Sequence, residues 1–423
     1  MPKDNIPPNL RVAVGQDGAR LHYAIAIALK RVGMLRALYT NWYNDGSLTA
    51  KAIIAAARLV APGLAQKMTE RQSPDLAGVP VYDAKFIGLL LGLFHDKAGL
   101  ARLVFRLARL CHRRKVLWFT PLGRGTREVD AYFVFSHAIA PAMAQACRHR
   151  GIKVILDQPI APATEIIRQL QINLDRWPGW AVEESDRIWR LQKSHEAAIF
   201  SLADCFTCAS DYVRDGLLAQ GVAADKISVI PYPFDVQHYP AVNRAGRSGP
   251  VRVGFVGQVG LRKGAPWFLE TAKLCDPDLV KFTMVGPAAL TDFGRKQMEQ
   301  HVELAGSVPR SQILDWLKRF DIFFFPSTCE GSAGAVMEAM ATGLPIITTH
   351  NSGTVIRHGV EGYIAPYDNP EVMAAYVTEL ASNTEKRHAM GEISRQRALE
   401  FSIEFYSTQL AAALKQMVWP AAG

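Results

Sequence analysis

Residues 325–345 decide the fold, and they read FPSTCEGSAGAVMEAMATGLP. The apolar run that leads into them, Ile322–Phe325, predicts a buried strand, and Ala333–Ala341 predicts a helix. The loop between strand and helix, residues 330–334, consists largely of small side chains that let a ligand approach the backbone closely. The first amide groups of a helix have no partners within it and lie at its positive end, so we expect phosphate oxygens to bind there. The backbone contacts would come from Gly331, Ser332, Ala333 and Gly334.

Two carboxylates flank this helix start, Glu330 in the loop and Glu338 about one turn inside the helix. Glu338 could accept hydrogen bonds from a ribose diol, as an acidic residue does in dinucleotide-binding folds. Glu330 is placed to hold sugar hydroxyls. The alternative interpretation is that both are ordinary carboxylates near a helix start, which the helix dipole favours.

Outward from this segment, short apolar strands alternate with helices along the chain. Continuous apolar strands of this kind are typical of parallel sheets that helices cover on both faces. The predicted strands are Leu10–Val14, Ala131–Phe135, Lys153–Leu156, Cys205–Cys208, Ile227–Ile230, Val251–Val256, Phe282–Val285, Ile322–Phe325 and Pro345–Thr348. Helices are predicted near Leu21–Val32, Ala140–Arg150, Ala265–Leu274, Arg310–Arg319, Ala333–Ala341, Glu371–Leu380 and Glu404–Val418.

A linker that contains proline, glycine and arginine, Tyr232–Pro250, divides the strands into two series. The predicted fold class is α/β, with two doubly wound, Rossmann-like domains facing a cleft, where the carboxyl ends of parallel strands would place a ligand. We assign residues 1–240 to the N-terminal domain, residues 251–402 to the C-terminal domain and residues 403–423 to a final helix.

The spacing of Glu330 and Glu338 resembles the Glu-x7-Glu signature of family 4 retaining glycosyltransferases, which use nucleotide sugars and have the GT-B fold. Further pieces that resemble the family, in the same order along the chain, are Val253–Gly257, Lys263-Gly264, Gly306–Val308, Gly343–Pro345 and Gly359–Gly362. The resemblance is strong over roughly residues 250–370 and weak before residue 200.

The resemblance implies roles for the positions that match. Lys263 corresponds to the lysine that contacts the donor diphosphate, where it would neutralise charge on the leaving nucleotide and so contribute to catalysis. Glu338 corresponds to the ribose-binding glutamate. Glu330, treated as catalytic, corresponds with the loop backbone to the part that holds the donor sugar. The other donor-binding positions implied are Gly18, Gly257, Gln258, Arg262 and Val308, the last through its backbone at the base.

Two positions depart from the family pattern. Gln258 stands where the family usually has an arginine, and Arg262 is the candidate to supply the missing cation unless it is a solvated surface charge. The family commonly places a histidine after the strand that corresponds to Lys153–Leu156, but here Asp157–Pro159 follows. His137, after the preceding strand, is the candidate polar group at the reacting sugar, and a structural histidine is the alternative.

The function implied is transfer of a sugar, with retention, from a nucleoside diphosphate sugar to a glycan or lipid-linked acceptor in cell-surface polysaccharide or glycolipid biosynthesis. Residues 1–240 would then hold the acceptor, residues 251–402 the donor, and the helix within residues 403–423 would cross back to the first domain. We expect no cofactor and no essential metal ion, since no paired carboxylates stand at a predicted strand end. Stabilisation of the leaving group would dominate catalysis, without a protein nucleophile.

Two other functions stay open at this point. The departures at Gln258 and at the family histidine are compatible with a non-catalytic scaffold that binds a sugar nucleotide at a membrane surface. Another GT-B enzyme, such as a nucleotide-sugar epimerase, would share the donor site and need no acceptor. Analysis of the products formed without an acceptor distinguishes these alternatives.

The net charge of +9 is concentrated in the first part of the chain. Residues 1–249 carry 32 Lys or Arg and 21 Asp or Glu, whereas residues 250–423 carry 16 and 18. Within residues 86–115, leucines and arginines recur at helical spacing after an apolar run, which is typical of interfacial membrane helices. We expect an anionic membrane surface as partner there; the alternative is a helix whose arginines lie in water. No nucleic-acid partner is expected, because aromatic residues are not interleaved with the basic ones.

Six cysteines in 423 residues do not make a disulfide framework, and Cys205 and Cys208 are expected to be buried thiols of one strand. The N-terminal sequence lacks the apolar core of a signal peptide. The longest dense apolar stretch, Phe86–Phe94, is far shorter than the ~20 residues that span a bilayer. We therefore expect a cytoplasmic protein, held peripherally on the inner face of the membrane if residues 86–115 bind lipid.

Overall fold

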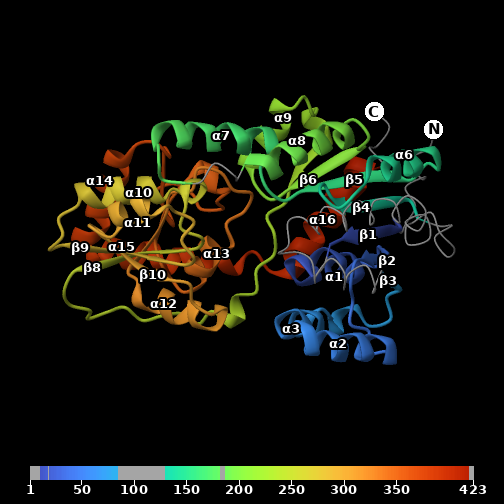
Figure 1. Ribbon diagram of the computed structural model, residues 1–423, viewed down its shortest axis with the longest axis horizontal. Coiled ribbons are helices and arrows are strands. Elements are labelled where there is room, and N and C mark those ends of the chain that lie inside the picture. Colours follow the sequence, from blue (N-terminus) through green and yellow to red (C-terminus); the bar gives the residue numbers. More distant parts are fainter. Residues whose placement is uncertain (1–9, 18, 84–128, 182–185, 419–423) are drawn as a thin grey trace. The chain divides into compact units, whose positions relative to one another are not determined.

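The computed structural model describes residues 10–17, 19–83, 129–181 and 186–418, whose elements are labelled in Figure 1. Two sheets, one of seven strands and one of six, form its framework. Helices alternate with the strands along the chain, so the predicted α/β class is confirmed. The predicted donor contact Gly18 and the basic segment 86–115 lie outside the described residues.

The first sheet has the strand order β3-β2-β1-β4-β5-β6-β7. Its strands are β1 (Val12–Gln16), β2 (Leu35–Thr40), β3 (Val81–Asp83), β4 (Ala131–Phe135), β5 (Lys153–Gln158), β6 (Cys205–Cys208) and β7 (Ile227–Val229). The pairings from β3 through β5 are parallel. The helices of this part are α1 (Ala24–Arg31), α2 (Leu48–Val60), α3 (Pro62–Glu70), α6 (Pro141–His149), α7 (Ala163–Arg176), α8 (Asp186–Phe200) and α9 (Asp211–Ala219).

The second sheet has the order β10-β9-β8-β11-β12-β13, and all of its pairings are parallel. Its strands are β8 (Val251–Val256), β9 (Val280–Val285), β10 (Val302–Gly306), β11 (Ile322–Phe325), β12 (Ile346–Thr349) and β13 (Gly362–Ala365). The helices are α10 (Ala265–Leu274), α11 (Asp292–Met298), α12 (Ile313–Arg319), α13 (Gly334–Ala341), α14 (Pro370–Ser382), α15 (Thr384–Leu399) and α16 (Ile403–Val418).

The strand order of the second sheet reverses between β8 and β11, and this reversal indicates where a ligand would bind. Figure 1 shows α10 and α12 on opposite sides of the strands, as right-handed crossovers require when the order reverses. From the carboxyl edge of the sheet, the chain therefore continues after β8 and after β11 toward opposite faces. In open α/β sheets ligands bind at such a switch point.

The aromatic strand β11 forms the centre of the second core. Phe325 stacks on Phe255 of β8 with ring centroids 5.1 Å apart, and Phe324 stacks on Phe268 of α10 at 5.0 Å. All four rings are buried. Because successive side chains of a strand point to opposite faces, a continuous apolar run is required where both faces of the sheet are covered.

The chain divides into two compact units. Unit 1 contains the described residues up to Asp157, Ala197–Thr207 and those from Ser407, and unit 2 contains the described residues of Gln158–Glu196 and Cys208–Tyr406. This division differs from the predicted boundary near residue 240, because α7, α9 and their flanking loops contact the elements of the second sheet. The cleft and the crossing of the final helix stay predictions.

Two expectations from composition can be compared with the described residues. Cys205 and Cys208 are buried in β6, as expected for thiols of one strand. None of the described helices combines the length and the apolar composition that a membrane crossing requires.

Candidate functional site

Two loops at the carboxyl edge of the second sheet are tied together. The loop after β8 makes a short 3-10 turn, Leu261–Lys263, and ends at Gly264 with a positive φ of 77°. A Cβ at Gly264 would lie 1.9 Å from the carbonyl oxygen of Pro326, in the loop after β11. The amide of Thr328 donates to the carbonyl of Arg262 at 3.0 Å. Glycine is therefore required where the two loops touch.

Lys263, Arg262 and Glu330 meet at this edge. The Glu330 carboxylate forms ion pairs with both cations, and the Arg262 guanidinium also donates to the carbonyl of Cys329 at 2.9 Å. The Lys263 ammonium lies 5.1 Å from the centre of the Phe325 ring. Burial lowers the pKa of Lys263, and the Glu330 charge opposes that shift. With two cations and one carboxylate, the cluster has an excess positive charge that suits an anionic ligand.

The loop that carries Glu330 is held by its backbone. The Glu330 amide donates to the carbonyl of Asn351 at 2.8 Å, and the Ser210 hydroxyl donates to the carbonyl of Gly331 at 2.6 Å. A Cβ at Gly331 would lie 1.9 Å from the carbonyl oxygen of Pro159. All of these residues belong to unit 2. The close approach of two backbones therefore fixes the direction in which Glu330 points.

The helix α13 begins where this loop ends. Its N-cap residue, Ala333, has no side-chain cap. Gly334, the first residue of the helix, is exposed, and a Cβ built on it would have no heavy atom within 4 Å. The helix start is therefore open and has the amide groups and the positive dipole end that bind anions.

Glu338 lies one turn into α13 and is only 8% exposed. Arg310 pairs with its carboxylate at 3.2 Å, and Tyr239 donates a hydrogen bond to it. Burial raises the pKa of Glu338, and the attraction of Arg310 opposes the shift only in part. Because the Arg310 side chain is 79% exposed, water screens this attraction. Glu338 is thus a partly desolvated hydrogen-bond acceptor beside the open helix start.

Replacing Glu338 by glutamine is expected to stabilise the protein relative to wild type increasingly as pH rises. Burial raises the pKa of the folded carboxyl above its ordinary value of 4.5. The contribution of Glu338 to the wild-type free energy of unfolding therefore falls as the pH rises from that ordinary value through the raised one. The loss is about 1.4 kcal/mol for each unit by which the two pKa values differ. Urea titrations of both proteins between about pH 4 and about pH 8 measure it. A difference that does not change with pH would contradict the burial of an ionised Glu338.

The other residues predicted to contact the donor lie in the loops that follow β8, β10 and β11. Gly257 follows β8 with a positive φ of 151° and donates its amide to the carbonyl of Val285 at 2.9 Å. Gln258 is exposed, and Val308 is half-buried after β10 and packs on the second core. Ser332 is half-buried in the loop before α13. These residues share the edge of the sheet that holds Lys263, and their contacts with a donor stay predictions.

His137 lies in unit 1, after β4. Its ring packs on Phe135 with centroids 5.8 Å apart. The other site residues described above lie in unit 2, so the role of His137 at a reacting sugar stays a prediction. Among the described residues, no three His, Cys, Asp or Glu side chains gather as metal ligands would. The expected independence of metal ions stays a prediction as well.

Arg310 and Tyr239 are site residues that the sequence reasoning missed. Both contact Glu338 although they lie 28 and 99 positions before it in the chain. A weak signal existed for Arg310, which closely follows the Gly306–Val308 segment of the family pattern. Nothing in the spacing of Tyr239 indicates its contact, because it stands in the linker that precedes the second sheet.

Comparison with known sequences gives one matching family. Residues 250–383 match the family described as glycosyl transferases group 1. The amylovoran biosynthesis glycosyltransferase AmsK of Erwinia amylovora is 29% identical over 180 residues, which are 39% of this chain and 44% of AmsK. The putative colanic acid biosynthesis glycosyltransferase WcaL of Salmonella typhimurium is 25% identical over 235 residues, which are 51% and 58%. The match spans about half the length of these curated relatives.

Solved structures match over nearly the whole chain. HepE of Anabaena, in complex with UDP and glucose, gives a TM-score of 0.57 at 16% identity and covers 96% of this chain and 100% of HepE. Sucrose-phosphate synthase of Thermosynechococcus elongatus gives 0.58 at 14% identity and covers 96% and 99%. At these identities the likeness shows the fold. The two parallel-sheet, Rossmann-like folds are those of GT-B structures, and the likeness to the group 1 glycosyl transferases covers residues 250–383.

Proposed function

We propose that this protein is a retaining glycosyltransferase that moves a sugar from a nucleoside diphosphate sugar to a glycan or lipid-linked acceptor. The observation that carries the proposal is the cluster of Lys263, Arg262 and Glu330 beside the open start of α13. A diphosphate would balance the excess positive charge of this cluster and accept hydrogen bonds from the first amides of the helix. The complex of HepE with UDP and glucose supports a uridine nucleotide as the donor.

The nucleoside would lie along α13 and the loop after β10. Glu338 would accept hydrogen bonds from the ribose hydroxyls, since its carboxylate lies one turn from the helix start. The backbone at Val308 would contact the base. Glu330, which pairs with both cations in this structure, would hold hydroxyl groups of the donor sugar once a diphosphate engages those cations.

In the proposed reaction, the bond between the anomeric carbon and the phosphate oxygen breaks while an acceptor hydroxyl attacks the same face of the sugar. The hydroxyl proton passes to the phosphate oxygen that departs, so no bond between sugar and protein forms. Negative charge builds up on the diphosphate, and Lys263 and the amides of α13 are placed to stabilise it. His137 is retained in the proposal as a polar contact from unit 1.

The biological setting proposed is the synthesis of a cell-surface polysaccharide or glycolipid on the cytoplasmic side of a membrane. The names of AmsK and WcaL, which refer to amylovoran and colanic acid biosynthesis, support this setting. The proposal includes contact of residues 86–115 with anionic lipid, and transfer without a metal ion.

Calorimetry with UDP tests the donor site directly. We expect the wild-type protein to bind UDP and the Glu338→Ala variant to bind it about 10-fold or more weakly, because hydrogen bonds to a charged group contribute about 1.5–3 kcal/mol. Glu270→Ala is the matched control, since Glu270 is a carboxylate of α10 that, within the described residues, forms its ion pair with Lys273. Its affinity for UDP should equal that of wild type.

The same proteins separate the enzyme from the scaffold. Transfer or hydrolysis of a UDP-sugar by the wild type, lost in Glu330→Ala, would exclude a protein that only binds the nucleotide. If Glu338→Ala bound UDP as tightly as the wild type, the assignment of the ribose site would be wrong.

A further inference from the structure

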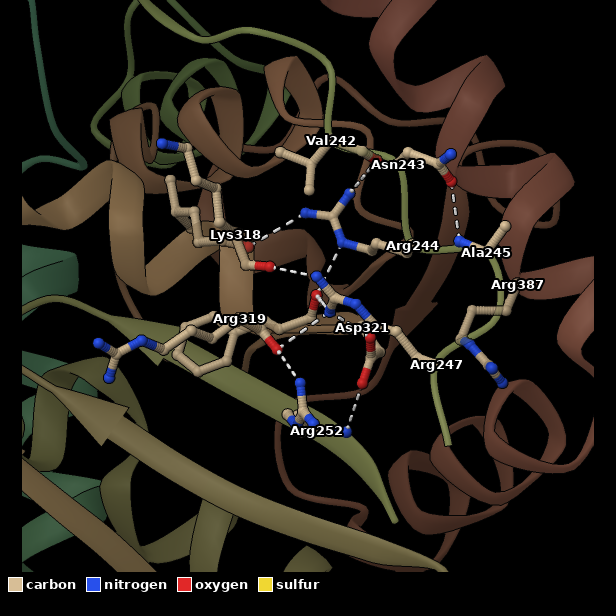
Figure 2. A network of polar contacts seen from close by, with 12 residues as sticks. Val242, Asn243, Arg244, Ala245, Arg247, Arg252, Lys318, Arg319, Asp321 and Arg387 are labelled. Atoms are coloured by element: carbon tan, nitrogen blue, oxygen red, sulfur yellow. Dashed lines mark hydrogen bonds and ion pairs between the residues drawn. The ribbon is translucent and has the colours of Figure 1, made fainter. Parts of the chain in front are cut away.

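Arg244 is a buried arginine in the linker that leads into β8, and it is only 8% exposed. Its Nε donates to the carbonyl of Phe320 at 2.7 Å, and its Nη2 donates to the carbonyl of Leu317 at 3.1 Å. Its Nη1 donates to the carbonyl of Thr342 at 2.8 Å. Figure 2 shows this side chain and its neighbour Arg247 among the carbonyl groups at the end of α12.

The partners of Arg244 come from the ends of two helices. Leu317 lies in the last turn of α12 (Ile313–Arg319), Phe320 follows that helix, and Thr342 follows the end of α13 (Gly334–Ala341). The last carbonyls of a helix have no partners within it and lie at its negative end. A guanidinium has five donors in a fixed fork, so it can bind both helix ends at once. Burial lowers the pKa of Arg244 to about 10, and the group therefore keeps its charge at neutral pH.

The opposite ends of these helices lead to the candidate donor site. The eight residues of α13 span about 12 Å, from Arg244 at the carboxyl end to the open start at Gly334. Glu338 lies between these ends, and its partner Arg310 stands in the turn that leads into α12. A displacement of α13 against α12 would therefore change the Arg310–Glu338 pair and move the helix start relative to Glu330.

We propose that Arg244 is a positioning residue for the donor site, because it joins the carboxyl ends of α12 and α13 and thereby fixes Glu338 and the first amides of α13. The identity of the ligand rests on the proposed function. The joining of the two helices does not, since it follows from the contacts of Arg244 alone.

Arg247 provides a matched control in the same cluster. Its guanidinium pairs with Asp321 at 2.7 Å and donates to the carbonyl of Lys318 at 2.6 Å. Its further partners are the carbonyls of Arg319, the last residue of α12, and of Phe320, the residue that follows the helix. Arg247 thus binds the end of α12, and its hydrogen bonds and ion pair within the described ranges do not reach α13. Loss of its fork should weaken the link between the linker and α12, while Arg244 still joins α12 to α13 and keeps Glu338 in place.

The test compares the full-length variants Arg244→Lys and Arg247→Lys, because lysine keeps the charge and loses the fork. Calorimetry with UDP should show about 10-fold weaker binding for Arg244→Lys and binding within about two-fold of wild type for Arg247→Lys. Hydrogen exchange of the amides in residues 334–341, measured without ligand, should speed up in Arg244→Lys and stay unchanged in Arg247→Lys. Thermal unfolding reports whether each variant is folded.

The inference is overturned if folded Arg244→Lys binds UDP and exchanges its α13 amides as the wild type does. It is also overturned if Arg247→Lys weakens UDP binding equally, which would indicate general loosening. If the wild type does not bind UDP, the proposed function fails, and the exchange of α13 alone decides whether Arg244 positions that helix. If Arg244→Lys does not fold, Arg244→Gln replaces it, since its amide keeps donors at the same position and loses the fork. The same contrast with Arg247→Lys is then required.

Discussion

Replacing Lys263 by alanine is expected to lower the kcat of sugar transfer by about 10²–10³-fold while the protein stays folded. In the proposed reaction Lys263 is a half-buried cation beside the diphosphate, and charge builds up there as the sugar departs. An interaction that strengthens in the transition state lowers kcat when it is removed. Arg262 still pairs with Glu330 in this variant, so no buried carboxylate is left alone.

Steady-state kinetics at saturating donor measure this effect, with Lys273→Ala as the control. Lys273 is an exposed lysine of α10 that pairs with Glu270 at 2.8 Å. Its replacement should leave kcat unchanged. If kcat of Lys263→Ala stayed within about two-fold of wild type, Lys263 would be a counter-ion of Glu330 rather than a group that stabilises the leaving diphosphate.

The sequence predicted the central strands of the second sheet and missed its edges. Val251–Val256 and Ile322–Phe325 were bounded correctly because these strands, β8 and β11, are buried on both faces and form continuous apolar runs. β10, with the sequence VELAG, and β13, with the sequence GYIA, lie at the two edges of the sheet. An edge strand has one neighbour and needs fewer apolar residues, so its composition does not distinguish it from a loop.

The first helix shows how backbone conformation can shift a predicted boundary. The apolar spacing predicted a helix from Leu21, but α1 begins at Ala24. Leu21, His22 and Tyr23 have positive φ angles of 48°, 49° and 63°, which an α-helix does not allow. Side-chain periodicity carries no information about φ, and these residues are not glycines, so the sequence contained no sign of the turn.

The candidate site was predictable only where its residues are close in sequence or match a known pattern. Glu330 and the loop up to Gly334 were found because the strand, loop and helix are consecutive. The ion pairs of Glu330 with Arg262 and Lys263 join residues 67 to 68 positions apart, and only the family pattern suggested Lys263. Arg244 contacts backbone carbonyl groups that tertiary packing brings together. Because every residue type has such a carbonyl, the sequence gives no sign of these contacts.

Two glycines of the Glu330 loop should respond in opposite ways to the same added methyl group. Gly331→Ala is expected to lower the free energy of unfolding by about 3 kcal/mol. The new Cβ would lie 1.9 Å from the Pro159 carbonyl oxygen and 2.6 Å from the Ile160 Cα, which are backbone atoms and cannot turn aside. Gly334→Ala should leave the stability unchanged or raise it by up to ~1 kcal/mol, since alanine favours the helix and meets no atom within 4 Å.

Urea unfolding and UDP calorimetry of both variants therefore separate a glycine that the fold requires from one that the ligand requires. Gly334→Ala should remain fully folded and still bind UDP about 10-fold more weakly, because its methyl group stands where the phosphates would approach the first amides of α13. Folded Gly334→Ala with wild-type affinity would mean that the diphosphate does not reach this helix start, and the anion site would then consist of Lys263 and Arg262 alone. Full stability of Gly331→Ala would mean that the loop can move away from Pro159, so its backbone could not hold Glu330 in one direction.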